Sequence, residues 1–193
     1  MWSKEQNKKV VYLTFDDGPT PQITDWVLQQ LQQYNAKATF FCIGKNVEEQ
    51  PEIFQRLLDS GNAVGNHTQN HINGWRNSTD FYLKNIEECE NAIGNLPNQQ
   101  QKYFRPPYGK ITPRQATAVL QKGYKIVMWD VLSADFDQTI THEECLQNVL
   151  NNVLAGSIII FHDSEKAWPN LQFALPKVLQ FLKENDFECE LLD

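Results

Sequence analysis

Short β-rich runs alternate with longer helical patterns along the whole of this 193-residue chain. In the helical segments, apolar residues recur every three or four positions, as they do on the buried face of a helix. The β-rich runs are residues 10–15, 38–43, 62–65, 103–105, 124–129, 157–161 and 188–192. Strict alternation implies right-handed crossovers between parallel strands. The chain is therefore expected to form an α/β fold, either an open doubly wound sheet or a compact, imperfectly closed (β/α)-type barrel.

Several of the expected helices carry start signals. Thr20 and Thr112 each precede a proline, a pair typical of an N-cap and the first helical residue. Thr141 and Glu144 fit a capping box. The expected helices lie around residues 21–31, 51–60, 79–93, 113–122, 142–153 and 171–184, with Pro176 in an early turn or at a kink of the last one. Residues 94–102 are expected to be an exposed loop, and one domain is expected to span residues 1–193.

Composition excludes some classes of protein. The net charge of −7 argues against nucleic acid or an anionic membrane as the main partner, since both require a basic face. No apolar run approaches the ~20 residues of a membrane span. The N-terminal residues lack the pattern of a signal peptide, so a cytoplasmic protein, or a secreted one that has been trimmed, is expected. The four cysteines are scattered without a CxxC pair and are expected to be buried free thiols; they are Cys42, Cys89, Cys145 and Cys189.

Titratable side chains collect where the β-rich runs end. In parallel α/β folds the active site lies at the carboxyl ends of the strands, so these residues are candidates for chemistry. They are Asp16, Asp17, His67, His71, Arg105, Asp130, Asp135, His162 and Asp163. The sequence does not indicate an oligomeric state.

The histidine pair suggests a metal site. Spaced four residues apart, His67 and His71 would share one face of a helical turn, where both imidazoles can reach one ion. A carboxylate from the end of the first run would complete a set of two histidines and one acid, as in hydrolytic zinc sites or non-haem iron sites. The iron reading is disfavoured because such sites usually lie on all-β folds. Surface histidines at this spacing also arise by chance.

Adjacent carboxylates at a strand end point in different directions, so one of Asp16 and Asp17 can bind metal while the other acts as a general base. The alternative is that this DDGP segment is only a solvated turn. Arg105 can pair with one of the acids or form an ordinary surface salt bridge. His162 follows four apolar residues and is either a general acid or a core histidine bonded to a backbone carbonyl.

Five ordered motifs carry a family resemblance. They are TFDDGP (14–19), NHTQNH (66–71), RPPYG (105–109), a Trp129…Asp135-aromatic segment and IIIFHD (158–163). Together they resemble the polysaccharide deacetylases, also called the NodB-homology or chitin-deacetylase-like family, carbohydrate esterase family 4. This resemblance implies a single irregular (β/α)7 barrel.

The resemblance also implies residue roles. Asp17, His67 and His71 match the family's ligands for one divalent ion, usually zinc, with cobalt, nickel or manganese tolerated. Asp16 matches its general base and His162 its general acid, with Arg105 orienting the base and Asp135 holding the charged network. The backbone N–H of Tyr108 matches the oxyanion donor. The implied substrate contacts are Pro107, Phe136, Ile160 at the acetate methyl, and Trp75, which lies in an aromatic-rich loop suited to sugar stacking.

The implied activity is metal-dependent hydrolysis of N-acetyl groups on an amino-sugar polymer or oligosaccharide of the N-acetylglucosamine type. That is a hydrolase acting on carbon–nitrogen bonds other than peptide bonds. Two departures concern substrate choice: Leu132 replaces the first Asp of the family's fourth motif, and Phe136 replaces its Trp. The alternatives are the same chemistry on a non-sugar amide or formamide, and a carbohydrate-binding barrel without turnover.

Overall fold

The computed structural model describes residues 1–3, 8–96 and 99–192. One sheet of parallel strands runs in the order β5-β4-β3-β2-β1-β7-β6, and β8 pairs with the start of β1. The strands are β1 (Val10–Asp16), β2 (Ala38–Cys42), β3 (Ala63–Asn66), β4 (Lys102–Phe104), β5 (Tyr124–Ile126), β6 (Val131–Leu132), β7 (Ile158–His162) and β8 (Glu188–Cys189). The ends of the sheet, β5 and β6, do not pair with each other, so the expected irregular, incompletely closed (β/α)7-type barrel is confirmed as a curled half-barrel.

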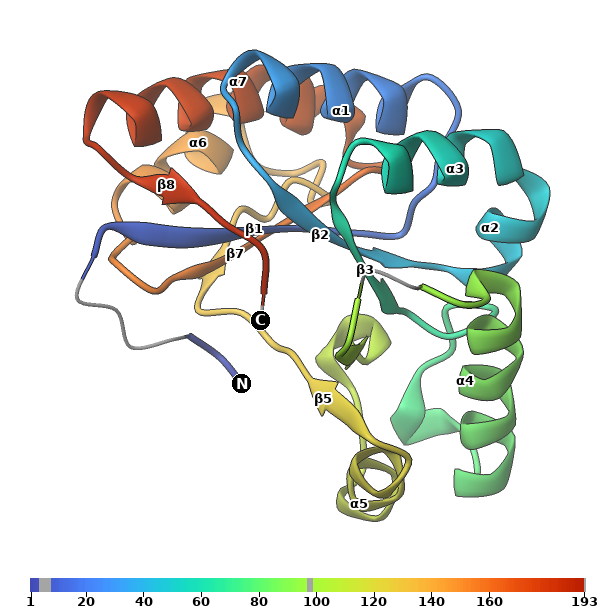
Figure 1. The fold of residues 1–193 in the computed structure, drawn as a ribbon. Coiled ribbons are helices and arrows are strands. Elements are labelled where there is room, and N and C mark those ends of the chain that lie inside the picture. The colour runs from blue at the N-terminus through green and yellow to red at the C-terminus, as the bar shows by residue number, and fades with distance from the viewer. Residues whose placement is uncertain (4–7, 97–98, 193) are drawn as a thin grey trace.

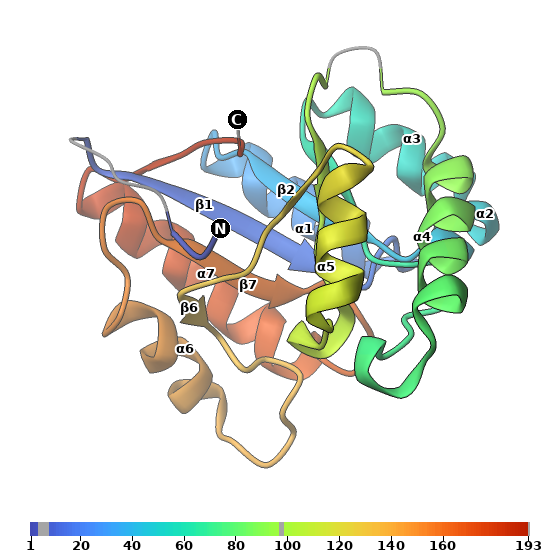
Figure 2. The same ribbon diagram turned by 90° about the horizontal axis from the view of Figure 1, so that it is seen from below.

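Helices cover the outer side of this sheet. They are α1 (Ile23–Gln33), α2 (Gly44–Glu49), α3 (Pro51–Asp59), α4 (Thr79–Ile93), α5 (Pro113–Gln121), α6 (His142–Leu150) and α7 (Trp168–Glu184), with 3-10 turns η1 (Gly74–Arg76) and η2 (Pro107–Gly109). Figure 1 shows α1, α3, α6 and α7 on one side of the sheet, while both chain ends lie on the other. Seen from below, the arrowheads of β1 and β7 point the same way, towards the side of α5 (Figure 2).

Strand β1 is buried on both faces, which explains its near-continuous apolar sequence. Val11, Leu13 and Phe15 face outward into the largest apolar cluster, which also contains side chains of α1, α3, α6 and α7. The alternate residues face the concave side, where Tyr12 joins a second apolar cluster. Because successive strand residues point to opposite faces, Thr14 and Asp16 also face the concave side. The sheet thus directs one polar row into the half-barrel.

The run 124–129 does not form one strand as expected. Strand β5 ends at Ile126, and a two-residue strand, β6, forms beside β7 instead. The Arg105 guanidinium explains the break, because it donates hydrogen bonds to the carbonyls of Val127 and Met128 at 3.2 and 2.9 Å. Those carbonyls are therefore engaged by a side chain rather than by a neighbouring strand.

The helix starts were predicted with mixed success. Thr141 forms the predicted capping box with Glu144, and Thr112 is the predicted N-cap, where it also forms a box with Gln115 that was not predicted. The prediction for Thr20-Pro21 was wrong: α1 begins at Ile23, after a turn in which Gln22 has φ 67°. The short helix α2 was missed, and α7 begins three residues earlier than expected and continues through Pro176.

Smaller expectations can also be compared with the structure. Cys42, Cys89 and Cys145 are buried free thiols, as predicted, whereas the free Cys189 is only partly buried. Part of the expected loop 94–102 lies outside the described residues, and its last residue begins β4. Among the described residues, no helix is both long and apolar enough to cross a bilayer.

Candidate active site

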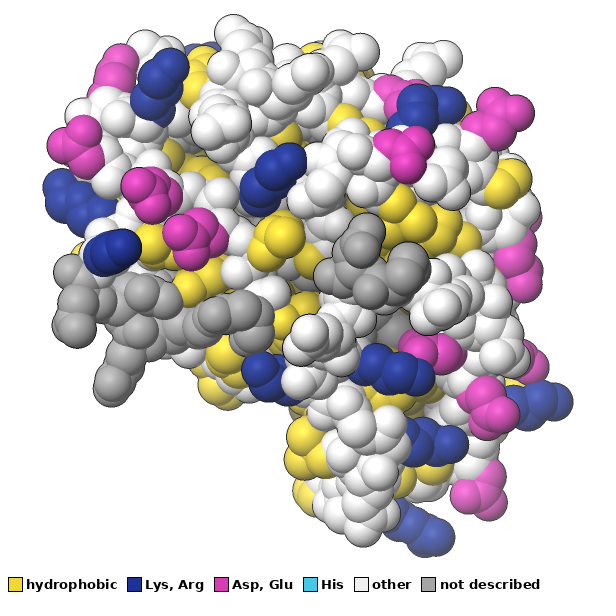
Figure 3. Space-filling model, in the orientation of Figure 1, with side chains coloured by type: hydrophobic (Ala, Val, Ile, Leu, Met, Phe, Trp, Pro, Cys, Tyr) yellow, Lys and Arg dark blue, Asp and Glu magenta, His cyan; other side chains and the backbone are white. Residues whose placement is uncertain are grey.

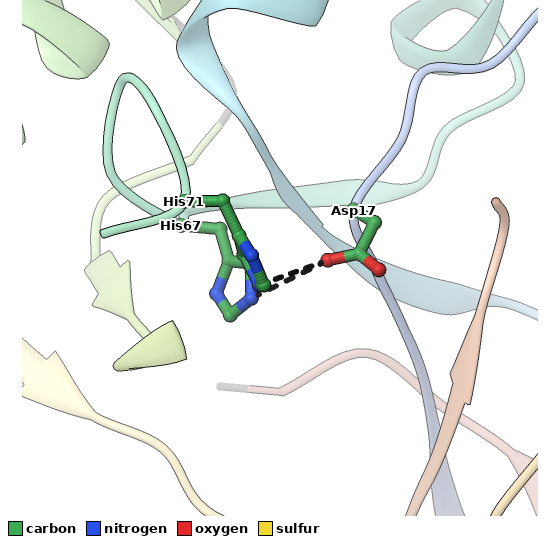
Figure 4. Close-up of side chains that lie close together, drawn as sticks. All are labelled: Asp17, His67 and His71. Atoms are coloured by element: carbon green, nitrogen blue, oxygen red, sulfur yellow. Dashed lines mark ion pairs between the residues drawn. The ribbon is translucent and has the colours of Figure 1, made fainter. Parts of the chain in front are cut away.

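Three side chains from two loops meet at the carboxyl edge of the sheet (Figure 4). Asp17 directly follows β1, and His67 and His71 follow β3. Asp17 Oδ1 lies 3.7 Å from His67 Nε2 and 3.2 Å from His71 Nε2. One ligand atom from each of the three residues can be chosen so that all lie within 4.8 Å of one another. A single cation placed between them would be in reach of all three.

The histidines do not lie on a helical turn, and that part of the prediction was wrong. The segment after β3 is an irregular loop in which Thr68 and His71 have φ of 65° and 51°. Asn66 shapes this loop, because its side chain accepts the Thr68 N–H and donates to the Ile86 carbonyl. The four-residue spacing brings the imidazoles together, but an Asx-type turn, not a helix, does so.

The donor atoms suit a divalent cation. His67 Nδ1 lies 2.8 Å from the Arg105 carbonyl oxygen, which only accepts; this fixes a proton on Nδ1 and turns Nε2 towards Asp17. Burial, followed by the nearby His67, lowers the pKa of His71 to about 4, so its imidazole is neutral at pH 7. Asp17 Oδ1 is buried and accepts no hydrogen bond from the described residues. Two imidazole Nε2 atoms and one carboxylate oxygen, all ligand types that a divalent ion accepts, therefore face one point.

Asp16 lies beside this triad in a different environment. Its side chain is almost fully buried, with Oδ1 accepting from Arg105 Nη1 at 2.7 Å and Oδ2 lying 3.6 Å from His67 Nε2. Burial raises its pKa, but the charges of Arg105, His67 and His162, with the hydrogen bond from Arg105, outweigh burial and hold the pKa below its ordinary value. Asp16 is thus an ionised carboxylate in a buried site.

Arg105 is itself fully buried and held on all sides. Besides Asp16 and the two carbonyls at the end of β5, its guanidinium donates to Thr14 Oγ1 at 2.8 Å and lies 4.1 Å from the centre of the Phe41 ring. The expected pairing of Arg105 with an acid is confirmed. A fixed planar fork of this kind orients a carboxylate more narrowly than a flexible lysine would.

His162 and Asp135 form a second charged pair. His162 Nδ1 lies 2.7 Å from Asp135 Oδ1, and the His162 backbone N–H donates to Asp135 Oδ2. Burial lowers the pKa of His162, but Asp135 more than compensates, with smaller contributions from Asp17 and Asp16, and raises it to about 9. The register pairs His162 with Asp16 on adjacent strands, so a protonated imidazole and an ionised carboxylate share the concave face.

Some of the expected substrate-contact residues lie beside the triad and His162, and others lie further away. The Tyr108 ring is 4.5 Å from that of His71, and Phe136 is 5.0 Å from that of His162. Pro107 is buried at the start of η2, and Ile160 is buried next to Thr14 in register. Trp75 is exposed in η1, where its indole N–H donates to the Ile111 carbonyl and Lys110 Nζ lies 4.1 Å from the ring centre. Its described contacts are with that loop and not with the triad.

The sequence model of the polysaccharide deacetylase family matches residues 3–127. The chain belongs to the polysaccharide deacetylase family. The fold and the convergence of all three triad residues agree with the resemblance carried by the five motifs.

Other family members extend the match beyond residue 127. A peptidoglycan-N-acetylglucosamine deacetylase from Bacillus cereus is 37% identical over 84% of this chain, which spans 59% of that relative's length. A second deacetylase of the same name and organism is 34% identical over 96% of this chain and 87% of its own. Chitin deacetylase 2 of Saccharomyces cerevisiae is 34% identical over 86% of this chain and 54% of its own.

Solved structures give the same picture of this deacetylase fold. A peptidoglycan N-acetylglucosamine deacetylase in complex with 4-naphthalen-1-yl-N-oxidanyl-benzamide superposes with a TM-score of 0.92 at 34% identity, covering 99% of this chain and 89% of that one. A pseudoenzyme of carbohydrate esterase family 4 from Bacillus anthracis has a TM-score of 0.86 at 25% identity, covering 97% and 65%. The fold alone is therefore compatible with a protein that lacks activity.

Some strand-end residues of this chain have other roles than the sequence suggests. Asp130 lies at the opposite end of β7, where its carboxylate accepts from the Ile158 N–H and the Ser157 hydroxyl. Thr14, which bonds Arg105, was not identified as a candidate; its place two residues before Asp16, on the same face of β1, was the available signal. Asp163 is fully buried and received no role from the sequence.

Proposed function

We propose that this protein is a metal-dependent hydrolase that removes N-acetyl groups from N-acetylglucosamine-containing glycans. The observation that carries the proposal is the pair of opposite protonation states beside the triad. An ionised Asp16 and a protonated His162 lie in register on adjacent strands, next to the ligand atoms of Asp17, His67 and His71. The names of the relatives, peptidoglycan and chitin deacetylases, support the substrate class.

Asp16 serves as the general base. Amide hydrolysis needs a nucleophile stronger than water at neutral pH, and a positioned carboxylate can take the proton as water attacks the carbonyl carbon. Arg105 holds one carboxylate oxygen, Oδ1, at 2.7 Å and leaves Oδ2 directed towards the triad. The base therefore has one oxygen for orientation and one for the proton.

His162 serves as the general acid. The amine of the sugar is a poor leaving group until its nitrogen is protonated. Asp135 keeps the proton on Nδ1 and raises the pKa of the ring to about 9, so Nε2 also carries a proton at pH 7. That proton passes to the departing nitrogen, and the products are acetate and a free amino sugar.

The developing oxyanion needs a donor in a fixed place. Tyr108 has φ 60°, an uncommon conformation for a residue with a side chain, within a turn beside His71. We assign its backbone N–H as the oxyanion donor. A single donor of this kind contributes on the order of 3 kcal/mol to transition-state stabilisation.

Asp17, His67 and His71 would hold the divalent ion, and zinc suits a set of two imidazoles and one carboxylate with open positions. When bound, such an ion lowers the pKa of water and polarises the amide carbonyl. Cobalt, nickel and manganese accept the same ligand types. The order of metal affinities and activities is a matter for measurement.

Residues on and around the concave face are suited to contact the acetyl group and the sugar. Ile160 and Leu132 pair in register on β7 and β6, and Leu132 is 37% exposed, so together they offer an apolar wall to the acetate methyl. Phe136 contacts His162 and is suited to the sugar next to the scissile amide, with Pro107 on the opposite loop. Trp75, 63% exposed, is assigned to a sugar ring further along the glycan.

A barrel without turnover is the main alternative, since a pseudoenzyme shares the fold and a mutant of it has restored activity. The intact base, acid and donor triad of this chain favour catalysis. The test is acetate release from N-acetylglucosamine oligomers and from peptidoglycan, measured with chelated protein and after Zn²⁺ is restored. Release that depends on the metal supports the proposal. If a simple amide or formamide is hydrolysed while neither glycan releases acetate, the activity belongs to non-sugar substrates. Absence of acetate release from every acetylated glycan would refute the proposal.

A further inference from the structure

We propose that Asp163 is a positioning residue for the metal site. It holds the loop that carries Asp17 by hydrogen bonds from the neighbouring strand. The inference rests on the proposed metal-dependent function, which has no role for this residue. Asp163 follows β7, is fully buried and contacts none of the three triad side chains in any described hydrogen bond or ion pair. Its hydrogen bonds go to the backbone of the Asp17 loop and to the Thr24 side chain.

Asp163 forms hydrogen bonds to the backbone on both sides of Asp17. Its backbone N–H donates to the Asp16 carbonyl at 3.1 Å, and its Oδ1 accepts the Gly18 N–H at 3.0 Å. The residue before the ligand and the residue after it are thus tied to one amino acid on the neighbouring strand. The peptide groups that flank Asp17 cannot rotate without breaking one of these bonds.

Thr24, near the start of α1, extends this hydrogen-bond network to Thr20. Its hydroxyl donates to Asp163 Oδ2 at 2.5 Å, and its oxygen accepts the Thr20 N–H at 2.8 Å. The loop from Asp16 to Thr20 is therefore fixed at three backbone points, one by the Asp163 backbone N–H and two by the buried side chains of Asp163 and Thr24. Thr24 is as fully buried as Asp163.

The ligand needs such a constraint because its backbone is strained. Asp17 has φ 83°, a left-handed conformation that residues with a side chain rarely adopt. Conformations of this kind persist only where the surroundings fix them. The packing is tight as well, since a Cβ on Gly18 would lie 2.0 Å from Asp163 Oδ2. Without the Asp163 contacts, we expect the Asp17 carboxylate to drift from the two imidazoles.

A merely structural role for Asp163 makes a different prediction. If the residue only stabilises the fold, its loss lowers the melting temperature but leaves the folded protein's affinity for metal unchanged. A positioning role lowers that affinity even at temperatures where the variant is fully folded. Metal affinity compared at equal folded fraction therefore separates the two.

The test uses four variants of the full chain, D163N, T24V, T24S and V149A. Asp163→Asn replaces Oδ2, the acceptor for the Thr24 hydroxyl, with an amide nitrogen, and Thr24→Val removes both hydrogen bonds of that hydroxyl, each at nearly constant volume. Thr24→Ser keeps the hydroxyl, and Val149→Ala makes a cavity on the buried face of α6, away from the loop. Zn²⁺ affinity of chelated protein is measured by competition with a chromophoric chelator, below the unfolding range of every variant.

We expect D163N and T24V to bind Zn²⁺ about ten-fold more weakly or worse, the size of effect seen when partners behind a ligand are removed. T24S and V149A should keep the wild-type affinity. Wild-type affinity in both D163N and T24V would overturn the positioning role, as would an equal loss in V149A. Should D163N not fold, T24V against T24S decides alone. A wild-type protein that binds no divalent ion would instead refute the proposed function.

Discussion

Two neighbouring carboxylates of similar chemistry have opposite surroundings at the carboxyl end of β1. Asp16 points to the concave face, where Arg105 engages it, and its pKa is held low. Asp17 turns away through its left-handed backbone and leaves Oδ1 without a hydrogen-bond donor among the described residues. The two aspartates have different roles because their side chains point in different directions, not because their chemistry differs.

Asp17→Asn and Asp16→Asn are therefore expected to fail differently. Both replacements keep the volume and remove one charge. Asp17→Asn removes a ligand, so the metal content should fall and excess metal should partly restore activity. Asp16→Asn removes the proton acceptor only, so metal stays bound while kcat falls by about 10²–10⁴-fold. Metal stoichiometry measured beside kcat checks this. Metal loss in Asp16→Asn with retention in Asp17→Asn would reverse the assignment.

Asp135 should set the alkaline limit of activity. The pKa of His162 is raised from 6.5 to about 9, and the reaction needs the protonated ring, so activity should persist through neutral pH and fall above about pH 9. The acid limb should lie below the ordinary pKa of Asp16, because that group must be ionised.

Asp135→Asn removes the charge beside His162 and should move the alkaline limb down by about 1–3 pH units. The measurement is kcat against pH for both proteins. Asn170→Ala is the control, since Asn170 bonds the backbone carbonyls of Asp135 and Asp137 and the His142 ring but not the Asp135 carboxylate. An unmoved alkaline limb would show that His162 is not the acid.

At the scale of elements, the strands and most helices follow from periodicity, whereas the loops that carry the site do not. The positions of Asp16, Asp17 and the histidines at strand ends were predictable because a parallel sheet gathers its carboxyl ends at one edge. The backbone of the 67–71 loop was not, because it depends on an Asn66 side chain bonded to α4. The early end of β5 likewise depends on Arg105, a long-range contact that local patterns do not reveal.

Arg105→Lys tests how much the elements depend on that contact. Lysine keeps the charge but cannot bond Asp16, Thr14 and the carbonyls of Val127 and Met128 together. Each buried group left unpaired costs about 1–3 kcal/mol, so the free energy of unfolding should fall clearly, and kcat with it. Denaturant unfolding measures the first. Arg56→Lys, in an exposed pair with Asp25, is the matched control and should change little.

At the scale of the molecule, the site joins segments that are far apart in sequence. The base, the acid and the ligands come from the ends of β1, β3 and β7, with Arg105 from the end of β4. The face shown in Figure 3 carries scattered charged side chains and no histidine in view. These residues meet at the carboxyl edge of the curled sheet, where the central strands end.

A metal bound between the β1 and β3 loops should therefore stabilise the whole protein, because it ties two distant segments that are separate in the unfolded chain. At a free metal concentration of 100 times Kd, the gain is about 2.7 kcal/mol. For a chain of this size, each kcal/mol corresponds to about 2–4 °C, so Zn²⁺ should raise Tm by about 5–10 °C over chelated protein. Asp17→Asn should lose most of the shift, whereas Asp16→Asn, which keeps all three ligands, should retain it. A shift that survives in Asp17→Asn would place the bound ion away from the triad.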